Sequence, residues 1–346
     1  MSGGPARIGV HLVGVGGYLP ERIVSNDELA GRLDTSDAWI RERTGITQRH
    51  LAASHETVAY MATEASRIAL ADAGIDASEV DAIILGTSTP DQAFPATALR
   101  VQAALGITRG FGFDVVAACS GFIFGLSTAE AFIRCGQART VLVIGSEVFS
   151  RIVDWTDRST CVLFGDGAGA VVLRAGEAES GRGILSTHLH GDGSCGDLLY
   201  ADSSIGFSDT PSLEMPSLDT PGLEMPCRKE PGYVRMSGRE VFRHAVSKLS
   251  ASVDEALAAN GLGHADVDWL VPHQANKRII DAMGKKLNLP PERVIVTVDR
   301  HANTSAASIP LALAEAVGDG RIRRGDLVLM EALGGGLAWG SALVRM

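Results

Sequence analysis

The sequence predicts an α/β protein in which helices cover the faces of parallel sheets, made of two duplicated halves. Apolar, β-branched runs alternate with helical patterns, which is typical of parallel sheets buried on both faces. The chain also repeats itself internally, and its 346 residues are too many for one ordinary core. We therefore expect an N-terminal half over residues 1–178 and a C-terminal half over residues 179–346.

The clearest part of the repeat consists of two segments that align without a gap. Residues 69–85 read ALADAGIDASEVDAIIL, and residues 256–271 read ALAANGLGHADVDWLV. Each contains the end of a helix, a glycine (Gly74 or Gly261), a short loop, the pair Val-Asp and a buried strand. Self-similarity of this kind indicates a duplicated structural unit.

The repeat continues downstream and gives two polar residues equivalent positions. In each half a strand, a turn, a helix, a glycine and a second strand follow one another; in the C-terminal half the first of these strands is VIVTV, residues 294–298. Cys119 precedes Gly136 by 17 residues, and Asn303 precedes Gly320 by 17 residues. We expect both residues at strand-to-helix junctions that face one shared cavity.

Composition argues against several classes of partner. The net charge of −10 disfavours nucleic acid, because phosphate binding requires a basic surface. The N-terminus lacks a basic segment followed by a long apolar run, and no apolar stretch approaches the length of a membrane span, so we expect neither a signal peptide nor a membrane partner. Five cysteines at irregular spacing do not resemble a disulfide framework, which favours the cytoplasm.

The sequence offers little that would hold a metal or a permanently bound cofactor. GDGAGA, residues 165–170, lies between the apolar runs CVLF and AVVL, which predicts a hairpin-like turn and not a dinucleotide-binding loop. His188 and His190 share one face of a predicted strand, but no third ligand accompanies them. We expect no metal site and no permanent cofactor.

Four stretches carry residues that could perform chemistry. Cys119, in FDVVAACSGFIFGL, stands where a strand gives way to a helix, and a helix N-terminus favours the thiolate and lowers its pKa. His273 follows a strand in VPHQANKRII, Asn303 lies in DRHANTSAASIP, and three glycines precede the last strand in LGGGLAWGSALVRM.

Taken singly, these stretches have simpler explanations. A core cysteine, a hydrogen-bonded turn histidine, an N-cap asparagine and a plain β-turn would each account for one of them. Taken together they suit acyl transfer, in which a cysteine holds a thioester and two donors polarise a second carbonyl. The glycine backbone N–H groups would then approach the reacting oxygen as an oxyanion hole.

The motifs AACSGF, PHQAN, NTSAASIP and GGGLAWGSALVR, in this order, resemble the β-ketoacyl-acyl carrier protein synthase III family. The resemblance covers nearly the whole chain. It implies the αβαβα layered fold of the thiolase superfamily, with two duplicated halves, which agrees with the internal repeat. It also implies a homodimeric acyltransferase that starts fatty-acid synthesis by condensing an acyl-CoA, expected to be acetyl-CoA, with malonyl-acyl carrier protein.

The resemblance assigns roles to the residues singled out above. Cys119 would receive the acyl group, and His273 and Asn303 would stabilise the enolate that forms when malonyl-acyl carrier protein loses CO2. The backbone N–H groups of Cys119 and Gly335 would form the oxyanion hole. Because decarboxylation supplies the carbanion, two neutral donors suffice and no strong base is needed.

Other family positions carry over one at a time as binding residues. The positions that match the coenzyme A site are Trp39, Arg43, Arg158 and Asn276. The positions that match the acyl pocket are Phe94, which would close the pocket of the neighbouring subunit, and Leu333.

A basic stretch matches the docking site for the acidic carrier protein. Arg278 matches a residue implicated in docking, and Lys277, Lys285 and Lys286 lie near it in the sequence. An ordinary solvated helix face is the alternative reading of the three lysines.

Three departures from the family pattern leave the starter acyl group open, and the smallest is Ser120, which stands after the cysteine where an alanine is common. Leu333 replaces an aromatic residue, and a proline-rich segment over residues 209–232, predicted to be a surface loop, has no counterpart that we recognise. A specialised condensing enzyme or acyltransferase that starts a polyketide or another secondary metabolite is therefore the alternative. A non-catalytic acyl-binding relative would be expected to lack Cys119.

Overall fold

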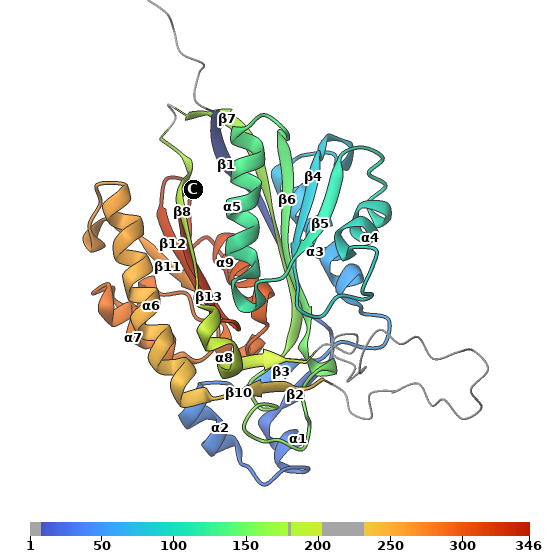
Figure 1. Ribbon diagram of the computed structural model, residues 1–346, viewed down its shortest axis with the longest axis vertical. Coiled ribbons are helices and arrows are strands. Elements are labelled where there is room, and N and C mark those ends of the chain that lie inside the picture. The colour runs from blue at the N-terminus through green and yellow to red at the C-terminus, as the bar shows by residue number, and fades with distance from the viewer. Residues whose placement is uncertain (1–7, 179–180, 203–231) are drawn as a thin grey trace, which may run out of the picture.

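The computed structural model describes residues 8–178, 181–202 and 232–346, in which helices and sheets alternate in five layers (Figure 1). The proline-rich segment lies outside the described residues except for Gly232. The predicted layered α/β architecture is confirmed. The boundary between residues 178 and 179 stays a prediction.

Two mixed sheets form the second and fourth layers. The first has the strand order β1-β7-β6-β4-β5, with bounds Ile8–Tyr18, Asp166–Glu177, Thr140–Val148, Ala82–Gly86 and Phe111–Val115. The second has the order β8-β13-β12-β11, with bounds Gly183–Gly191, Ala338–Arg345, Leu327–Gly334 and Trp269–Pro272. A parallel bridge joins Leu270 of β11 to Val294, the position that β5 holds beside β4. The two sheets therefore follow one plan.

Each sheet is only partly parallel, which corrects the expectation of parallel sheets. β4 pairs in parallel with β5 and β6, and β11 pairs in parallel with β12, whereas β7 and β13 run antiparallel to their neighbours. In the C-terminal half only residues 335–337 join β12 to β13. So short a connection can join antiparallel strands, because a parallel pair needs a long crossover.

Helices fill the remaining three layers. The helices between the sheets are α5 (Gly121–Arg134) and α9 (Ser308–Gly318), which share one apolar core with both sheets (Figure 1). The helices outside the first sheet are α3 (Val58–Ala73) and α4 (Thr97–Ala104). The helices outside the second sheet are α6 (Gly238–Ala259) and α7 (Lys277–Lys286).

Alternation along the strands explains why each sheet can be buried on both faces. On β6, Val141 and Val143 pack into the central core, while Leu142 and Ile144 pack under α3. β12 alternates in the same way between the central core and the core under α6. The apolar runs read from the sequence are therefore strands with two buried faces.

The glycines that marked the repeat end helices as predicted. Gly74 follows α3 with φ 62°, and Gly261 follows the end of α6 with φ 66°. Gly136 and Gly320 follow α5 and α9 with φ 72° and 78°. All four stand in the left-handed region that favours glycine after a helix.

GDGAGA forms no turn, so this prediction was wrong. Asp166 to Ala170 lie inside β7, and its glycines allow α9 to pack closely. A Cβ atom at Gly169 would stand 2.6 Å from the backbone nitrogen of Leu311 in α9. A run of small residues here serves helix–sheet contact, which local turn chemistry does not reveal.

VIVTV was also predicted as a strand, and most of it is not one. Val294 makes the single bridge to β11, and α8 (Val298–His301) follows almost at once. The segment lies at the edge of the second sheet, where a strand has one partner only. Its apolar residues are therefore buried without a continuous ladder of backbone hydrogen bonds.

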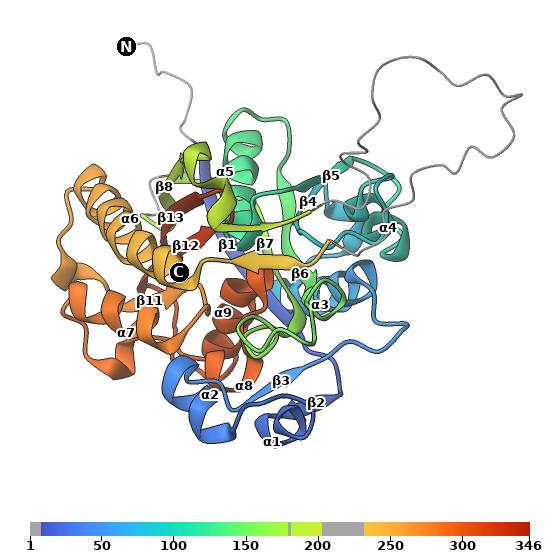
Figure 2. The same ribbon diagram turned by 60° about the horizontal axis from the view of Figure 1, so that its bottom comes forward.

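Short elements cover the end of the layers where the junctions lie (Figure 2). From the N-terminal half these are β2 (Ile23–Ser25), α1 (Asn26–Ala30), α2 (Asp37–Thr44) and β3 (Gln48–His50). From the C-terminal half they are β9 (Leu199–Ala201) and β10 (Val234–Met236). Among the described residues, no helix has the length and apolarity to cross a membrane.

Candidate active site

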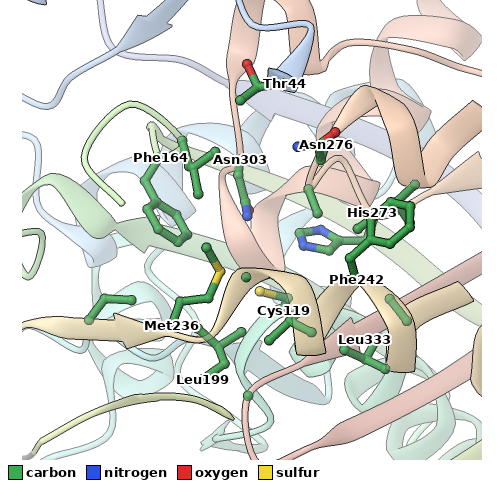
Figure 3. A pocket seen from close by; sticks show the side chains of 18 of the residues that line it. Thr44, Cys119, Phe164, Leu199, Met236, Phe242, His273, Asn276, Asn303 and Leu333 are labelled. Atoms are coloured by element: carbon green, nitrogen blue, oxygen red, sulfur yellow. The ribbon is translucent and has the colours of Figure 1, made fainter. Parts of the chain in front are cut away.

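A cavity of about 840 Å³ is lined by residues of both halves and brings the three predicted catalytic residues together. Cys119 comes from the N-terminal half, and His273 and Asn303 come from the C-terminal half. Their side chains point into the same space (Figure 3). All three are buried, whereas Arg43 and Arg278, which also line the cavity, are exposed and mark its mouth.

Cys119 lies between β5 and α5, in a short turn over Ala118–Ser120. Ala118 has φ 46°, a left-handed conformation that costs energy for a residue with a Cβ atom and is often found at functional sites. Gly334, at the end of β12, packs against this turn: a Cβ atom there would stand 2.7 Å from the Cys119 backbone nitrogen. The glycines before the last strand therefore do approach the cysteine.

We expect Gly334→Ala to destabilise the protein by about 1–3 kcal/mol, because the added methyl group must displace the turn that carries Cys119. Urea unfolding would measure the loss. Gly193→Ala is the matched control, since a Cβ atom at Gly193 meets nothing within 4 Å. Equal stability of both variants would contradict the close approach.

The thiol of Cys119 differs from the expectation of a lowered pKa. Burial raises its pKa to about 12, the charge of Glu147 adds to this, and a hydrogen bond with the Ser305 hydroxyl only partly opposes it. The side chain is 5% exposed, and α5 begins two residues later, at Gly121. Desolvation outweighs the helix N-terminus here, so the free enzyme holds a neutral thiol.

Asn303 is fixed so that its amide can donate into the cavity. Its Oδ1 accepts a hydrogen bond from the backbone N–H of Ser305 at 2.9 Å, and its own backbone N–H donates to the carbonyl of Leu163 at 2.9 Å. Because the oxygen is occupied, the Nδ2 group is the one left for a ligand. In Figure 3 this nitrogen points towards the space above Cys119.

His273 is a neutral imidazole with a defined donor. Burial lowers its pKa to about 3. Its Nδ1 lies 2.6 Å from the Ser308 hydroxyl, whose oxygen also accepts the backbone N–H of Gln274 at 3.3 Å. With Ser308 donating to Nδ1, the proton of the imidazole resides on Nε2. His273 and Asn303 can therefore present two neutral N–H donors to one oxygen.

Comparison with known proteins agrees with this geometry. The family models described as 3-oxoacyl-[acyl-carrier-protein (ACP)] synthase III and its C-terminal part match residues 113–193 and 257–346. A curated relative from Acidiphilium cryptum, named beta-ketoacyl-[acyl-carrier-protein] synthase III, is 66% identical over 96% of this chain and 98% of its own length. The chain belongs to this family.

Solved structures show the same fold. The 3-oxoacyl-[acyl-carrier-protein] synthase III of Aquifex aeolicus superposes with a TM-score of 0.87 at 46% identity, covering 98% of this chain and 100% of the other. The priming β-ketosynthase of the R1128 polyketide pathway superposes with a TM-score of 0.87 at 36% identity, covering 99% and 98%. This chain is thus a condensing enzyme of the acyltransferase type with the thiolase-like fold.

In this synthase III chain, two of the predicted coenzyme A residues lie at the mouth of the cavity. Trp39 and Arg43, both on α2, line the cavity, and the Arg43 guanidinium lies 4.7 Å from the centre of the Trp39 ring. Arg158 also stacks on Trp39, at 5.3 Å, and bonds Asp34, but it is not part of the lining. The structure therefore gathers one aromatic ring and two guanidinium groups.

Asn276 lines the cavity but is also engaged in local structure. Its Oδ1 caps α7 by accepting the backbone N–H of Arg278 at 2.9 Å, and its Nδ2 donates to the carbonyl of Arg43 at 3.1 Å. The side chain thereby ties α7 to α2. A further contact with a ligand stays a prediction.

The predicted docking patch is partly neutralised. Arg278 is exposed beside the cavity, but Lys277 pairs with Asp281 and Lys286 pairs with Asp254. Lys285 lies in the last turn of α7. The net positive charge near the mouth is therefore smaller than the count of basic residues suggests.

The two predicted acyl-pocket residues differ in position. Leu333 is buried and lines the cavity beside the site. Phe94 is 84% exposed and is absent from the cavity lining of its own chain. This exposure is what a residue that serves a neighbouring subunit would show, and its role stays a prediction.

Sequence reasoning missed the residues that support the three central ones. Ser308 and Ser305 lie in NTSAASIP and Gln274 lies in PHQAN, so the motifs contained them without assigning them a contact. Glu147 lies near the end of the largely apolar strand β6 (Thr140–Val148), and no motif singled it out. Among the described residues, no group of three His, Cys, Asp or Glu side chains could hold a metal ion.

Proposed function

We propose that this protein starts fatty-acid synthesis by condensing an acyl-CoA with malonyl-acyl carrier protein, with release of CO2 and formation of 3-oxoacyl-acyl carrier protein. The relatives are named β-ketoacyl- or 3-oxoacyl-[acyl-carrier-protein] synthase III, and these names give the product of the proposed reaction. The observation that carries the proposal is that Cys119, His273 and Asn303 line one buried cavity with an exposed mouth. A nucleophile facing two neutral donors suits two successive acyl-transfer steps.

In the first step, Cys119 takes the acyl group from acyl-CoA, and the backbone N–H groups of Cys119 and Gly335 are proposed to bind the oxyanion. In the second step, malonyl-acyl carrier protein replaces coenzyme A. As it loses CO2, negative charge develops on its thioester oxygen, and His273 Nε2–H and Asn303 Nδ2–H stabilise that charge. The resulting carbanion attacks the Cys119 thioester. Arg278 is proposed to dock the carrier protein, with Lys277, Lys285 and Lys286 nearby.

The direct test is intact-mass spectrometry with a panel of acyl-CoAs, followed by a chase with malonyl-acyl carrier protein. The proposal expects one acetyl group on Cys119 that the chase discharges as acetoacetyl-acyl carrier protein. Absence of any covalent acyl group with every acyl-CoA would overturn it.

The second candidate function is priming of a polyketide or another secondary metabolite. The structural similarity to the R1128 priming β-ketosynthase favours it. Phe149, Phe164 and Met236 give the cavity apolar walls that could also receive a longer starter. Labelling only by longer or unusual acyl groups in the same panel would favour this reading over fatty-acid initiation.

The Trp39 site is proposed to bind the adenine end of coenzyme A, with the base stacked on the ring and the Arg43 and Arg158 guanidiniums beside it. We expect Trp39→Ala to raise the KM for acyl-CoA about tenfold with little change in kcat, because stacking of a base contributes about 1–3 kcal/mol. Trp155→Ala is the matched control, since Trp155 does not line the cavity and should leave KM unchanged. An unchanged KM for acyl-CoA in Trp39→Ala would show that the adenine base does not bind at Trp39.

The family also suggests the oligomeric state, the cellular location and the cofactor requirement. A homodimer in which Phe94 closes the partner's acyl pocket, a cytoplasmic location and the lack of a permanent cofactor are proposed from the family. Sedimentation of the purified chain would test the dimer directly.

A further inference from the structure

A buried carboxyl group lies near the Cys119 thiol, and one hydroxyl group interacts with both. Glu147, on β6, is 0% exposed. The Ser305 hydroxyl donates a hydrogen bond to Glu147 Oε1 at 3.1 Å, and the same hydroxyl lies near enough to the Cys119 thiol to act on its pKa, which it lowers against the larger effect of burial. Three side chains from distant parts of the sequence, Cys119, Ser305 and Glu147, thus interact with one another.

The backbone holds Ser305 in this place. Gly145, two residues before Glu147, lets the Ser305–Ala307 turn touch β6: a Cβ atom at Gly145 would stand 2.1 Å from the carbonyl oxygen of Ala306. Ser305 itself has φ 50°, and its N–H is bound by Asn303. A residue in a strained backbone conformation, whose backbone N–H and side-chain hydroxyl are both hydrogen-bonded, indicates a position set by function.

The other partners of Glu147 favour its ionised form. The backbone N–H of Ser88 donates to both carboxyl oxygens at 3.0 Å, and the Thr87 hydroxyl donates at 3.1 Å. The Thr89 hydroxyl donates as well. These donors oppose the desolvation that raises the pKa of Glu147, and the balance puts this pKa at about 7. Both the acid and the carboxylate are therefore accessible near neutral pH.

A carboxylate so close to the thiol cannot serve to stabilise a thiolate. Its negative charge raises the pKa of Cys119, since two like charges in a buried site repel strongly. The most favourable state of the pair therefore has one proton in total, which resides on either the thiol or the carboxyl group. Ionising the cysteine costs least when the carboxylate takes its proton.

His273 is poorly suited to be that acceptor. Its low pKa makes it a weak base, and its Nδ1 is occupied by the Ser308 hydroxyl. The remaining Nε2 carries a proton and is a donor. The acceptor for the thiol proton must therefore be another group that reaches Cys119.

We propose that Glu147 accepts the Cys119 thiol proton through the Ser305 hydroxyl when the cysteine is acylated. This inference rests on the proposed function, because it concerns the same site. Glu147 receives the proton without touching the acyl group, and Ser305 positions the transfer.

The S–H bond of Cys119 breaks as its proton passes to Ser305, whose own proton passes to the Glu147 carboxylate. The sulfur attacks the thioester carbon, a new S–C bond forms, and coenzyme A leaves as a thiolate that takes a proton from solvent. When the malonyl-derived carbanion later displaces Cys119 as a thiolate, the proton on Glu147 returns to it through Ser305.

Single-turnover measurements on the full chain test this inference. Acylation by acetyl-CoA is followed by quenched-flow mass spectrometry, and discharge of the fully formed acyl-enzyme by malonyl-acyl carrier protein is followed separately. Glu147→Gln and Ser305→Ala are each expected to slow acylation by about 10²-fold, the low end for loss of a positioned proton acceptor. Discharge should change less than about threefold, because a thiolate can leave without a proton. Glu147→Asp should recover part of the acylation rate.

The control is Glu331→Gln, the same chemical change in another fully buried carboxyl whose pKa burial raises to about 8. It should acylate at the normal rate. Acylation that is unchanged or faster in Glu147→Gln would overturn the inference, because removal of the repelling charge would then be the whole effect. Equal slowing of acylation and discharge, without recovery in Glu147→Asp, would show a structural role and also overturn it. Failure of the wild-type protein to acylate would overturn the proposed function instead.

Discussion

Cys119→Ala is expected to abolish acyl-enzyme formation and to lower the overall condensation rate by more than about 10³-fold. The variant lacks the sulfur that forms the thioester, and removal of a covalent nucleophile has effects of this size or larger in other enzymes. Among the described residues, Cys119 is the one cysteine that lines the cavity with His273 and Asn303, and no other described thiol is placed to replace it there. Intact mass after incubation with acetyl-CoA measures the acyl group directly.

The matched control for this prediction is Cys161→Ala. Cys161 is also buried and free, and burial raises the pKa of its thiol to about 11, but it does not line the cavity. The control should take up one acetyl group as the unchanged protein does. A covalent acyl group that persisted in Cys119→Ala would show that another residue is the nucleophile.

The sequence predicted the elements whose signals are local. The helix ends at Gly74 and Gly261 appear where expected, because a left-handed C-terminal residue is encoded at one position. The strands around them follow from apolar runs that no helix pattern matches. The equal spacing of Cys119 and Asn303 from their helix ends predicted that both would reach one cavity, and they do.

The properties that the sequence could not provide depend on contacts between distant segments. The pKa of Cys119 was expected to be low from its own helix, whereas burial raises it, in a turn against which Gly334 of the other half packs. His273 receives its hydrogen bond from Ser308, which lies 35 residues away. Glu147 and Ser305 are separated by 158 residues, and nothing in the strand sequence TVLVIGSEV indicates such a partner. Periodicity places elements, but desolvation and long-range hydrogen bonds set the chemistry.

His273→Ala and Asn303→Ala are expected to spare acylation of Cys119 and to slow its discharge by malonyl-acyl carrier protein by about 10³-fold each. Each variant removes one N–H donor from the oxygen that becomes negative on decarboxylation, and loss of one such donor costs about 10²–10³ in rate. Quenched-flow mass spectrometry separates the two half-reactions. Slow acylation with normal discharge in these variants would show that His273 and Asn303 act in the acylation step and not in the condensation step.

The conservative variant His273→Gln sharpens this prediction. A glutamine amide can donate a hydrogen bond without acting as a base, so it should recover part of the discharge rate if His273 works as a neutral donor. The low pKa of His273 further implies that discharge does not depend on its protonation between pH 5 and 8, because the imidazole stays uncharged well above a pKa of about 3. The contrary result would be a discharge rate that decreases as the pH is lowered past 6.5 in the unchanged protein but not in His273→Gln. It would show that the imidazole gains a proton in this range, so the neutral state inferred from the structure would be wrong.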